Sequence, residues 1–209
     1  MNTSAIIEGF ELYVDDTTEL SGAQELTLAQ KIYDKICDDR PWEWLKKEAT
    51  GTMLTATTIL TPSDFAHFLE NRQMTNNADS YDGNARPVGI LINGTKWLQI
   101  INWSDRKQYI NRDGFAYYDA ANNTITTTYP QPAGATYSFD YKFVPPALTL
   151  GTAPIFPERF HPMVYHGMAV DDMIIQLFDK ARSYAQENGA MYNSFLQRLA
   201  LWNANLRMD

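Results

Sequence analysis

The chain has 209 residues, 44% of them hydrophobic and 13% aromatic, enough to bury the core of one domain or of a domain with a large insert. Its formal net charge of −8 argues against a protein that clamps DNA regardless of sequence, because displacing counterions from phosphates requires an excess of lysine and arginine. No apolar run has the length of a membrane span, and residues 1–16 lack the basic and apolar regions of a signal peptide, so no membrane is expected.

The first predicted element is a helix over residues 21–39. Ser21 and Gln24 form a capping-box pattern, and apolar residues follow at spacings of three and four. Pro41 ends the helix, because the residue before a proline is pushed out of the α region. Cys37, the only cysteine, cannot form an intrachain disulfide and is expected to be a buried structural thiol.

Two tryptophans, Trp42 and Trp44, follow directly after the proline. Clustered aromatic residues beside an amphipathic helix usually fill a core. We therefore expect both to anchor the join between the helix and the segment that follows; an exposed stacking platform is the alternative.

The next hundred residues have the pattern of strands and turns. Residues 51–60 are rich in threonine and β-branched residues and are predicted to form a strand. Residues 61–64 are expected to start a short helix with Pro62 at its first position. Residues 74–86 are polar and are predicted to form a surface loop.

Two hairpins are predicted beyond this loop. Asn93-Gly94 between two apolar runs indicates a type I′ turn, and Asn122-Asn123 marks a second hairpin. Ser104 is expected to cap one helical turn between them. A final strand alternates aromatic residues on one face: Tyr137, Phe139, Tyr141 and Phe143. Together these elements predict a small antiparallel sheet or sandwich.

The closing segment is helical over residues 158–206. Pro162 suits a first helical turn, and Asn188-Gly189 is predicted to interrupt the helix by a kink or tight turn. The opening and closing helices each have an apolar face that neither can bury alone. The predicted fold class is α+β: residues 1–50 and 150–209 form a helical bundle, and residues 51–149 are a β-rich insertion.

No motif in the sequence indicates a reaction. His161 and His166 are five residues apart, which places them on different helix faces and argues against a shared metal. The adjacent Asp171 and Asp172 also diverge and are interpreted as a solvated helix face. We therefore expect no enzyme activity, no metal site and no cofactor.

The aromatic residues of the insert allow two interpretations. Trp97, Trp103, Tyr117 and Tyr118 are able in principle to stack on sugars or bases. A half-buried sheet, however, requires alternating aromatic residues whatever its function. Core packing is the simpler interpretation.

With both helical ends in view, the chain resembles the head-to-tail connector or adaptor proteins of tailed bacteriophages, the group that includes tail tubular protein A-like adaptors. The likeness lies in two segments. Residues 15–52 read DDTTELSGAQELTLAQKIYDKICDDRPWEWLKKEATGT, and residues 154–203 read PIFPERFHPMVYHGMAVDDMIIQLFDKARSYAQENGAMYNSFLQRLALWN. The central β region is also similar to the variable sheet of that family.

The resemblance implies a virion protein of the neck or tail, assembled in the host cytoplasm. It implies a ring of twelve copies beneath the portal protein, joined to a tail tube or nozzle protein, with DNA passing through the bore without specific binding. An acidic subunit suits this role, because it repels phosphates and lets the genome slide.

Two contact hypotheses follow from the resemblance. Trp202, Leu206 and Arg207 near the chain end are expected to contact the portal, and the polar loop at 74–86 is expected to contact the tail. Two alternatives remain open: a carbohydrate-binding module with helices that drive oligomerisation, and another neck or tail-completion protein.

Overall fold

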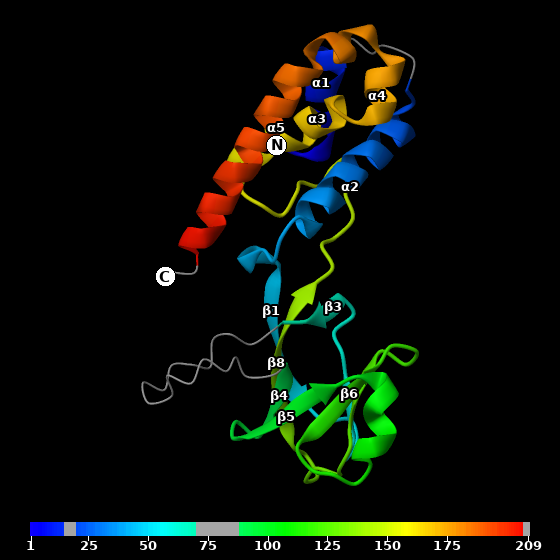
Figure 1. Ribbon diagram of the computed structural model, residues 1–209, viewed down its shortest axis with the longest axis vertical. Coiled ribbons are helices and arrows are strands. Elements are labelled where there is room, and N and C mark those ends of the chain that lie inside the picture. The colour runs from blue at the N-terminus through cyan, green and yellow to red at the C-terminus, as the bar shows by residue number, and fades with distance from the viewer. Residues whose placement is uncertain (15–19, 70–87, 207–209) are drawn as a thin grey trace. The chain divides into compact units, whose positions relative to one another are not determined.

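A computed structural model describes residues 1–14, 20–69 and 88–206. The polypeptide divides into two compact units. The helical unit comprises residues 1–45 and 145–209, and the β unit comprises residues 46–144 (Figure 1). Helices and a sheet occur together in the chain, so the predicted α+β class is confirmed.

The helical unit is built from two segments that are far apart in the sequence (Figure 1). Its described helices are α1 (Thr3–Val14), α2 (Gly22–Asp38), α3 (Pro162–Ala169), α4 (Asp172–Leu177) and α5 (Asp179–Asn205), with the short 3₁₀ helices η1 (Glu43–Leu45) and η3 (Glu158–Phe160). α3 lies among α1, α2 and α5, so that the N-terminal and C-terminal helices share one core.

Helix α1 was not predicted. Its buried face carries Ile6, Phe10 and Val14, each four residues after the last, and Ile6 and Phe10 are fully buried. This spacing is the pattern of an amphipathic helix. The pattern was therefore present in the sequence.

Helix α2 begins with the capping box. The Ser21 hydroxyl oxygen accepts a hydrogen bond from the Gln24 backbone N–H at 3.4 Å, and Gln24 Oε1 accepts one from the Ser21 N–H at 2.8 Å. Two donors that a helix start leaves unpaired are satisfied in this way. The helix ends at Asp38, shortly before Pro41, and Cys37 on its inner face is buried.

Trp42 lies in the core directly after α2. It is 1% exposed, and its indole N–H donates to the Ile36 carbonyl at 2.6 Å. The ring of Trp44 stacks on Trp42 with centroids 5.6 Å apart and meets Phe156 edge-on at 5.7 Å. The pair fixes the chain as it leaves α2.

The prediction of a break at Asn188-Gly189 is wrong. Pro162 does occupy the first position of α3, but α5 runs through Gly189 without interruption, and the breaks fall at Val170 and Phe178. An interior glycine costs a helix only about 1 kcal/mol, which tertiary packing readily offsets. Here the buried Asn188 side chain is hydrogen-bonded to α3 and holds α5 in place.

The β unit is one sheet of eight strands within the described residues. The strands are β1 (Lys46–Thr52), β2 (Thr58–Leu60), β3 (Phe65–Phe68), β4 (Gly89–Ile92), β5 (Lys96–Ile101), β6 (Phe115–Asp119), β7 (Thr124–Thr127) and β8 (Thr136–Phe143). Their order is β1-β8-β4-β5-β6-β7-β2, and β3 also pairs with β8. A single sheet replaces the sandwich that was one of the two expected forms.

The sheet is mixed rather than wholly antiparallel. β5 and β6 pair in parallel, with Ile100 opposite Ala116. Parallel neighbours need a crossover of about a dozen residues or more. Residues 102–114 make it and contain the 3₁₀ helix η2 (Trp103–Tyr109). The helical turn expected here starts at Trp103, so Ser104 is not its cap.

Two other local predictions need correction. The strand predicted at 51–60 is two strands, because the chain turns at residues 53–57, where the Leu54 N–H donates to the Thr58 carbonyl at 2.8 Å. No helix starts at 61–64; strand β3 follows instead. Phe65 packs against the aromatic rings of β8, and this packing overrides the helix-start signal of Pro62.

The two predicted hairpins are confirmed. Asn93 and Gly94 both have positive φ, as a type I′ turn requires, and they join β4 to β5. Asn123, also at positive φ, lies in the turn between β6 and β7. Turn chemistry therefore determined these connections.

Candidate functional site

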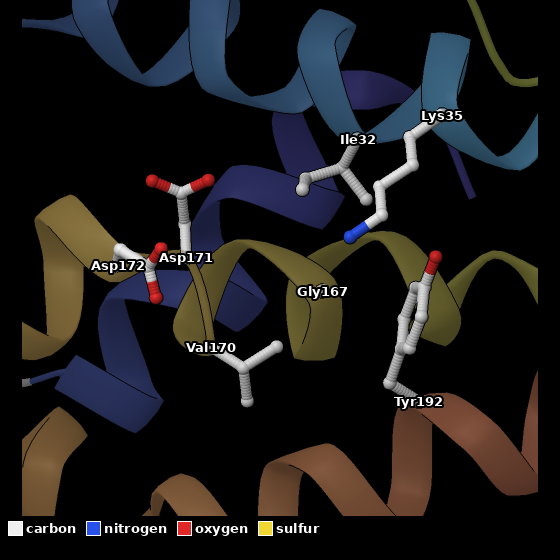
Figure 2. Close-up of a pocket in the computed structure, with 7 residues that line it drawn as sticks. All are labelled: Ile32, Lys35, Gly167, Val170, Asp171, Asp172 and Tyr192. Atoms are coloured by element: carbon white, nitrogen blue, oxygen red, sulfur yellow. The ribbon is translucent and has the colours of Figure 1, made fainter.

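A small pocket of about 110 Å³ lies between α2, α3 and α5 of the helical unit (Figure 2). Its lining residues are Ile32 and Lys35 from α2, Gly167 from α3, Val170, Asp171 and Asp172 from the end of α3 to the start of α4, and Tyr192 from α5. Ligand pockets usually enclose about 300–1,000 Å³. This one has room for a single functional group rather than for a substrate.

Gly167 makes the pocket narrow. A Cβ built on Gly167 would lie 2.6 Å from Ile32 Cγ2 and 3.0 Å from Tyr192 Cε2. The absence of a side chain on α3 therefore allows α2 and α5 to approach closely. Sequence reasoning missed this residue, because a glycine inside a helical pattern carries no sign of what it contacts.

One end of the pocket offers hydrogen-bond donors. The Lys35 ammonium lies 6.0 Å from the centroid of the Tyr192 ring, and Figure 2 shows the two side chains entering the pocket from α2 and α5. Burial raises the pKa of Tyr192, and the charge of Asp39 raises it further. The hydroxyl therefore stays protonated at neutral pH and can donate, beside the ammonium, to an anionic or carbonyl oxygen.

The other end of the pocket has a structural role. Asp171 Oδ2 accepts from the Lys31 ammonium at 2.6 Å, and Oδ1 accepts from the Met173 backbone N–H, so that Asp171 caps α4. Its side chain is only 10% exposed, so it is not the solvated position that was expected. None of the lining residues is a serine, cysteine, threonine or histidine, and the pocket has no nucleophile with an adjacent base.

The two histidines of the helical unit have separate partners. The ring nitrogens of His161 each lie 2.8 Å from a backbone carbonyl, one of Met1 and one of Phe156. His166 Nδ1 lies 2.9 Å from Asn188 Oδ1. Across residues 1–14, 20–69 and 88–206, no cluster of three or more His, Cys, Asp and Glu side chains is arranged to hold a metal ion.

The C-terminal end of α5 combines anchored and exposed residues. Asn203 is buried, and its Oδ1 accepts from the Glu43 backbone N–H at 2.7 Å. Trp202 is half-buried, with its ring 6.2 Å from that of Phe160. Leu201 and Leu206 are 68% and 41% exposed.

A family model described as SU10 adaptor protein matches the chain over residues 1–209. The chain belongs to the SU10 adaptor protein family. It is thus a phage adaptor-type protein, structural in class, that is localised to the virion and contacts other virion components. No curated protein matches the chain. The predicted phage adaptor is confirmed at the level of the family, while the tail tubular protein A-like group stays a prediction.

The positions expected to contact the portal differ in their exposure to solvent. Leu206 is open to solvent, Trp202 partly faces the core, and Arg207 lies outside the described residues. Leu201, which sequence reasoning missed, is the most exposed of the large apolar residues of α5. Its position two residues after Leu199, on the opposite side of the helix, was the signal that could have found it.

The β unit of this adaptor offers no free aromatic platform among the four residues considered. Trp97, Tyr117 and Tyr118 are half-buried, and the Tyr118 hydroxyl donates to Asn123 Oδ1 at 2.8 Å. Trp103 is exposed, but the Arg106 guanidinium covers one face of its ring at 3.7 Å. A sugar stacking on that face would have to displace this arginine.

A helix that crosses a lipid bilayer needs about 20 consecutive, mostly apolar residues. Within the described ranges, no helix is both long enough and apolar enough to span one.

Proposed function

We propose that this protein forms the head-to-tail adaptor ring of a tailed phage, with twelve copies seated beneath the portal and joined to a tail tube or nozzle protein. The observation that carries the proposal is the match of the whole chain to a phage adaptor family. Packaged DNA passes through the bore of the ring without sequence-specific contacts.

The distribution of charge supports free passage of DNA. The helical unit contains 16 acidic and 8 basic residues, so it accounts for the full net charge of −8, while the β unit contains nine of each. A surface with an acidic surplus repels phosphates and does not hold a passing duplex. We therefore assign the helical unit to the parts of the ring that face DNA.

The exposed end of α5 is the proposed portal contact. Leu201 and Leu206 offer apolar side chains to a partner, whereas Trp202 and Asn203 hold this end of the helix on the core. Truncation before Trp202 would therefore damage the fold as well as the contact. A sharper variant ends at Asn205 and removes only Leu206 and the residues after it.

The experiment is size-exclusion chromatography with light scattering of the adaptor mixed with the portal protein of the same phage. The wild-type chain should form a complex with one adaptor copy for each portal subunit. The chain ending at Asn205 and the variant Leu201→Asp should lose the complex and keep their unfolding midpoints. Met191→Asp is the matched control, since Met191 is a 41% exposed residue on the same helix.

Two results would reject parts of this proposal. A wild-type chain that ignores the portal rules out the adaptor position beneath it. Normal binding by Leu201→Asp and by the shortened chain moves the contact away from the end of α5. The tail contact predicted for residues 74–86 lies outside the described residues and stays a prediction.

A further inference from the structure

The β unit carries a basic and apolar surface around η2. This surface, the η2 patch, is defined by Trp103, Arg106, Lys107, Ile110 and Arg112. Trp103 is 46% exposed and Ile110 is 61% exposed, so both offer apolar surface to a partner. Residues 103–112 carry these three cations against one carboxylate, Asp105, in a chain with a net charge of −8.

The two arginines of the η2 patch lie against aromatic rings of the β unit. Arg106 Nη1 donates to the Trp103 carbonyl at 2.7 Å while its guanidinium lies on the indole ring, which leaves other N–H donors for a ligand. Arg112 lies over the Tyr109 ring at 5.7 Å. Nearby Asp113 is engaged by the Lys96 ammonium at 2.6 Å, and this contact lowers the pKa of the Asp113 carboxyl.

These properties favour a protein partner over DNA. A phosphate backbone satisfies arginine and lysine, but it offers nothing to Ile110 or to the open edge of Trp103. Exposed tryptophan and arginine side chains are typical anchors of protein interfaces. The partner should therefore present carboxylates around apolar side chains.

The helical unit of the same protein has such a surface. The receiving surface is defined by Glu8 and Leu12 of α1 and by Asp172, Met173 and Leu177 of α4. Leu12 is 77% exposed, and Met173 and Leu177 are 50% and 52% exposed. Glu8 and Leu12 are four positions apart, as are Met173 and Leu177, so each pair shares a helix face, and Asp172 directly precedes Met173.

The contacts of α5 bring the two parts of the receiving surface together. The Lys180 ammonium donates to the Leu12 carbonyl at 3.0 Å, only three residues after Leu177. Figure 1 shows α4 and the start of α5 at the same end of the helical unit as the C-terminal end of α1. Arg182 pairs with Asp179 at 3.1 Å, and the Lys180 ammonium, although it contacts the Leu12 carbonyl, keeps its charge. The two carboxylates of Glu8 and Asp172 therefore outnumber this one cation.

We propose that the η2 patch of one copy binds the receiving surface of the next copy. This inference rests on the proposed ring, and it assigns the residues that join neighbouring subunits. The two surfaces are different, so the contact is head-to-tail, and a bound pair keeps one free surface of each kind. Repetition of such a contact builds a ring when the rotation closes.

Mixing two variants of the full-length chain tests this contact. Trp103→Ala with Arg106→Glu removes the η2 patch, and Leu12→Lys with Leu177→Lys places cations on the receiving surface. In analytical ultracentrifugation the wild type should associate at about 0.5 mM and low salt, and each variant alone should stay monomeric, with association weakened at least about tenfold. The mixture should form a dimer and stop, since one intact pair of surfaces remains.

Two control variants show whether a charged residue at any exposed leucine weakens association. Leu54→Glu in the β unit and Leu150→Lys in the helical unit alter residues that are 62% and 54% exposed outside both surfaces. Both should associate as the wild type does. Circular dichroism should give every variant the wild-type unfolding midpoint.

Several outcomes would overturn the inference. These are a wild type that stays monomeric, either variant associating as the wild type does, and a mixture that fails to dimerise. If the Trp103 and Arg106 variant loses affinity for duplex DNA while self-association is unchanged, the η2 patch is a DNA surface instead. Because portal binding is measured separately, normal portal complexes from these variants would reject the interface and leave the adaptor function standing.

Discussion

Gly167 of α3 lies directly against Ile32 of α2, with no room for a side chain between them. A Cβ on Gly167 would come within 2.6 Å of Ile32 Cγ2, closer than such atoms approach in proteins. The Tyr192 ring of α5 closes the same position at 3.0 Å. Three helices from both ends of the chain therefore meet at one glycine.

Gly167→Ala should destabilise the helical unit by about 1–3 kcal/mol, because overpacking forces the neighbouring side chains or helices apart. Gly189→Ala is the matched control, since the nearest atom to its Cβ would be Val170 Cγ1 at 3.9 Å. Relief of the helical cost of glycine should stabilise that variant by about 0.5–1 kcal/mol. Urea unfolding measures both. A loss of stability in Gly189→Ala would argue that α5 bends there after all.

Asp171 should contribute to stability in two separable ways. It caps α4 through the Met173 N–H and pairs with the Lys31 ammonium. Asp171→Ala should lose about 1 kcal/mol for the cap and up to about 1 kcal/mol for the ion pair, whereas Asp171→Asn should lose only the second part. Raising the salt concentration should narrow the gap between wild type and Asp171→Asn. If Asp171→Asn and Asp171→Ala destabilise the protein equally, the cap contributes nothing to its stability.

His166 should make the protein less stable in mild acid. Its ring is 2% exposed and is surrounded by the rings of Tyr13, Tyr165 and Phe195, and burial lowers its pKa. The unfolded chain, with a histidine pKa of about 6.5, then binds a proton that the folded chain does not. Stability is therefore complete above about pH 6.5 and is lost as the pH falls through the lower pKa of the folded state.

Thermal unfolding between neutral pH and pH 5 measures this effect. His166→Gln cannot take up a proton, so its unfolding midpoint should fall less than that of the wild type over this range. Parallel curves for wild type and His166→Gln would show that carboxylates alone cause the acid dependence.

Local signals in the sequence identified much of the fold. The Ser21 and Gln24 pair marked the start of α2, and Asn93-Gly94 marked the first hairpin, because each motif satisfies its own backbone groups. The alternating aromatic residues of β8 were also visible. The α+β class followed from these periodicities.

Other features depend on residues that are distant in the sequence. Gly189 suggested a break because the free-energy cost of a glycine in a helix can be read from the local sequence. The contact that holds α5 joins Asn188 to His166, 22 residues away, and cannot be read in this way. The parallel pairing of β5 with β6 could not be read from the sequence. The alternation of side chains along a strand is the same whether its neighbour is parallel or antiparallel. The η2 patch was missed for a related reason: an aromatic residue beside a strand looks the same whether it is buried or exposed.

The last prediction concerns a three-residue network in the β unit. Asp64 Oδ2 accepts from the Lys47 ammonium at 2.6 Å, and Oδ1 accepts from the Tyr141 hydroxyl at 2.9 Å. Burial, with the Asp64 carboxylate adding to it, raises the pKa of Tyr141 to about 12. This tyrosine therefore stabilises the fold below about pH 10, and that contribution is lost as the pH rises through about 12.

Asp64→Asn should lower the pKa of Tyr141, because the negative charge beside the hydroxyl is gone while the burial is unchanged. The tyrosinate absorbance of Asp64→Asn, minus that of the double variant with Tyr141→Phe, isolates this one residue among the 12 tyrosines. Asp119→Asn is the control, since that carboxylate accepts from Asn122 and should leave the titration of Tyr141 unchanged. If Tyr141 titrates identically in wild type and Asp64→Asn, then burial alone sets its pKa and the hydrogen bond to Asp64 has no electrostatic weight.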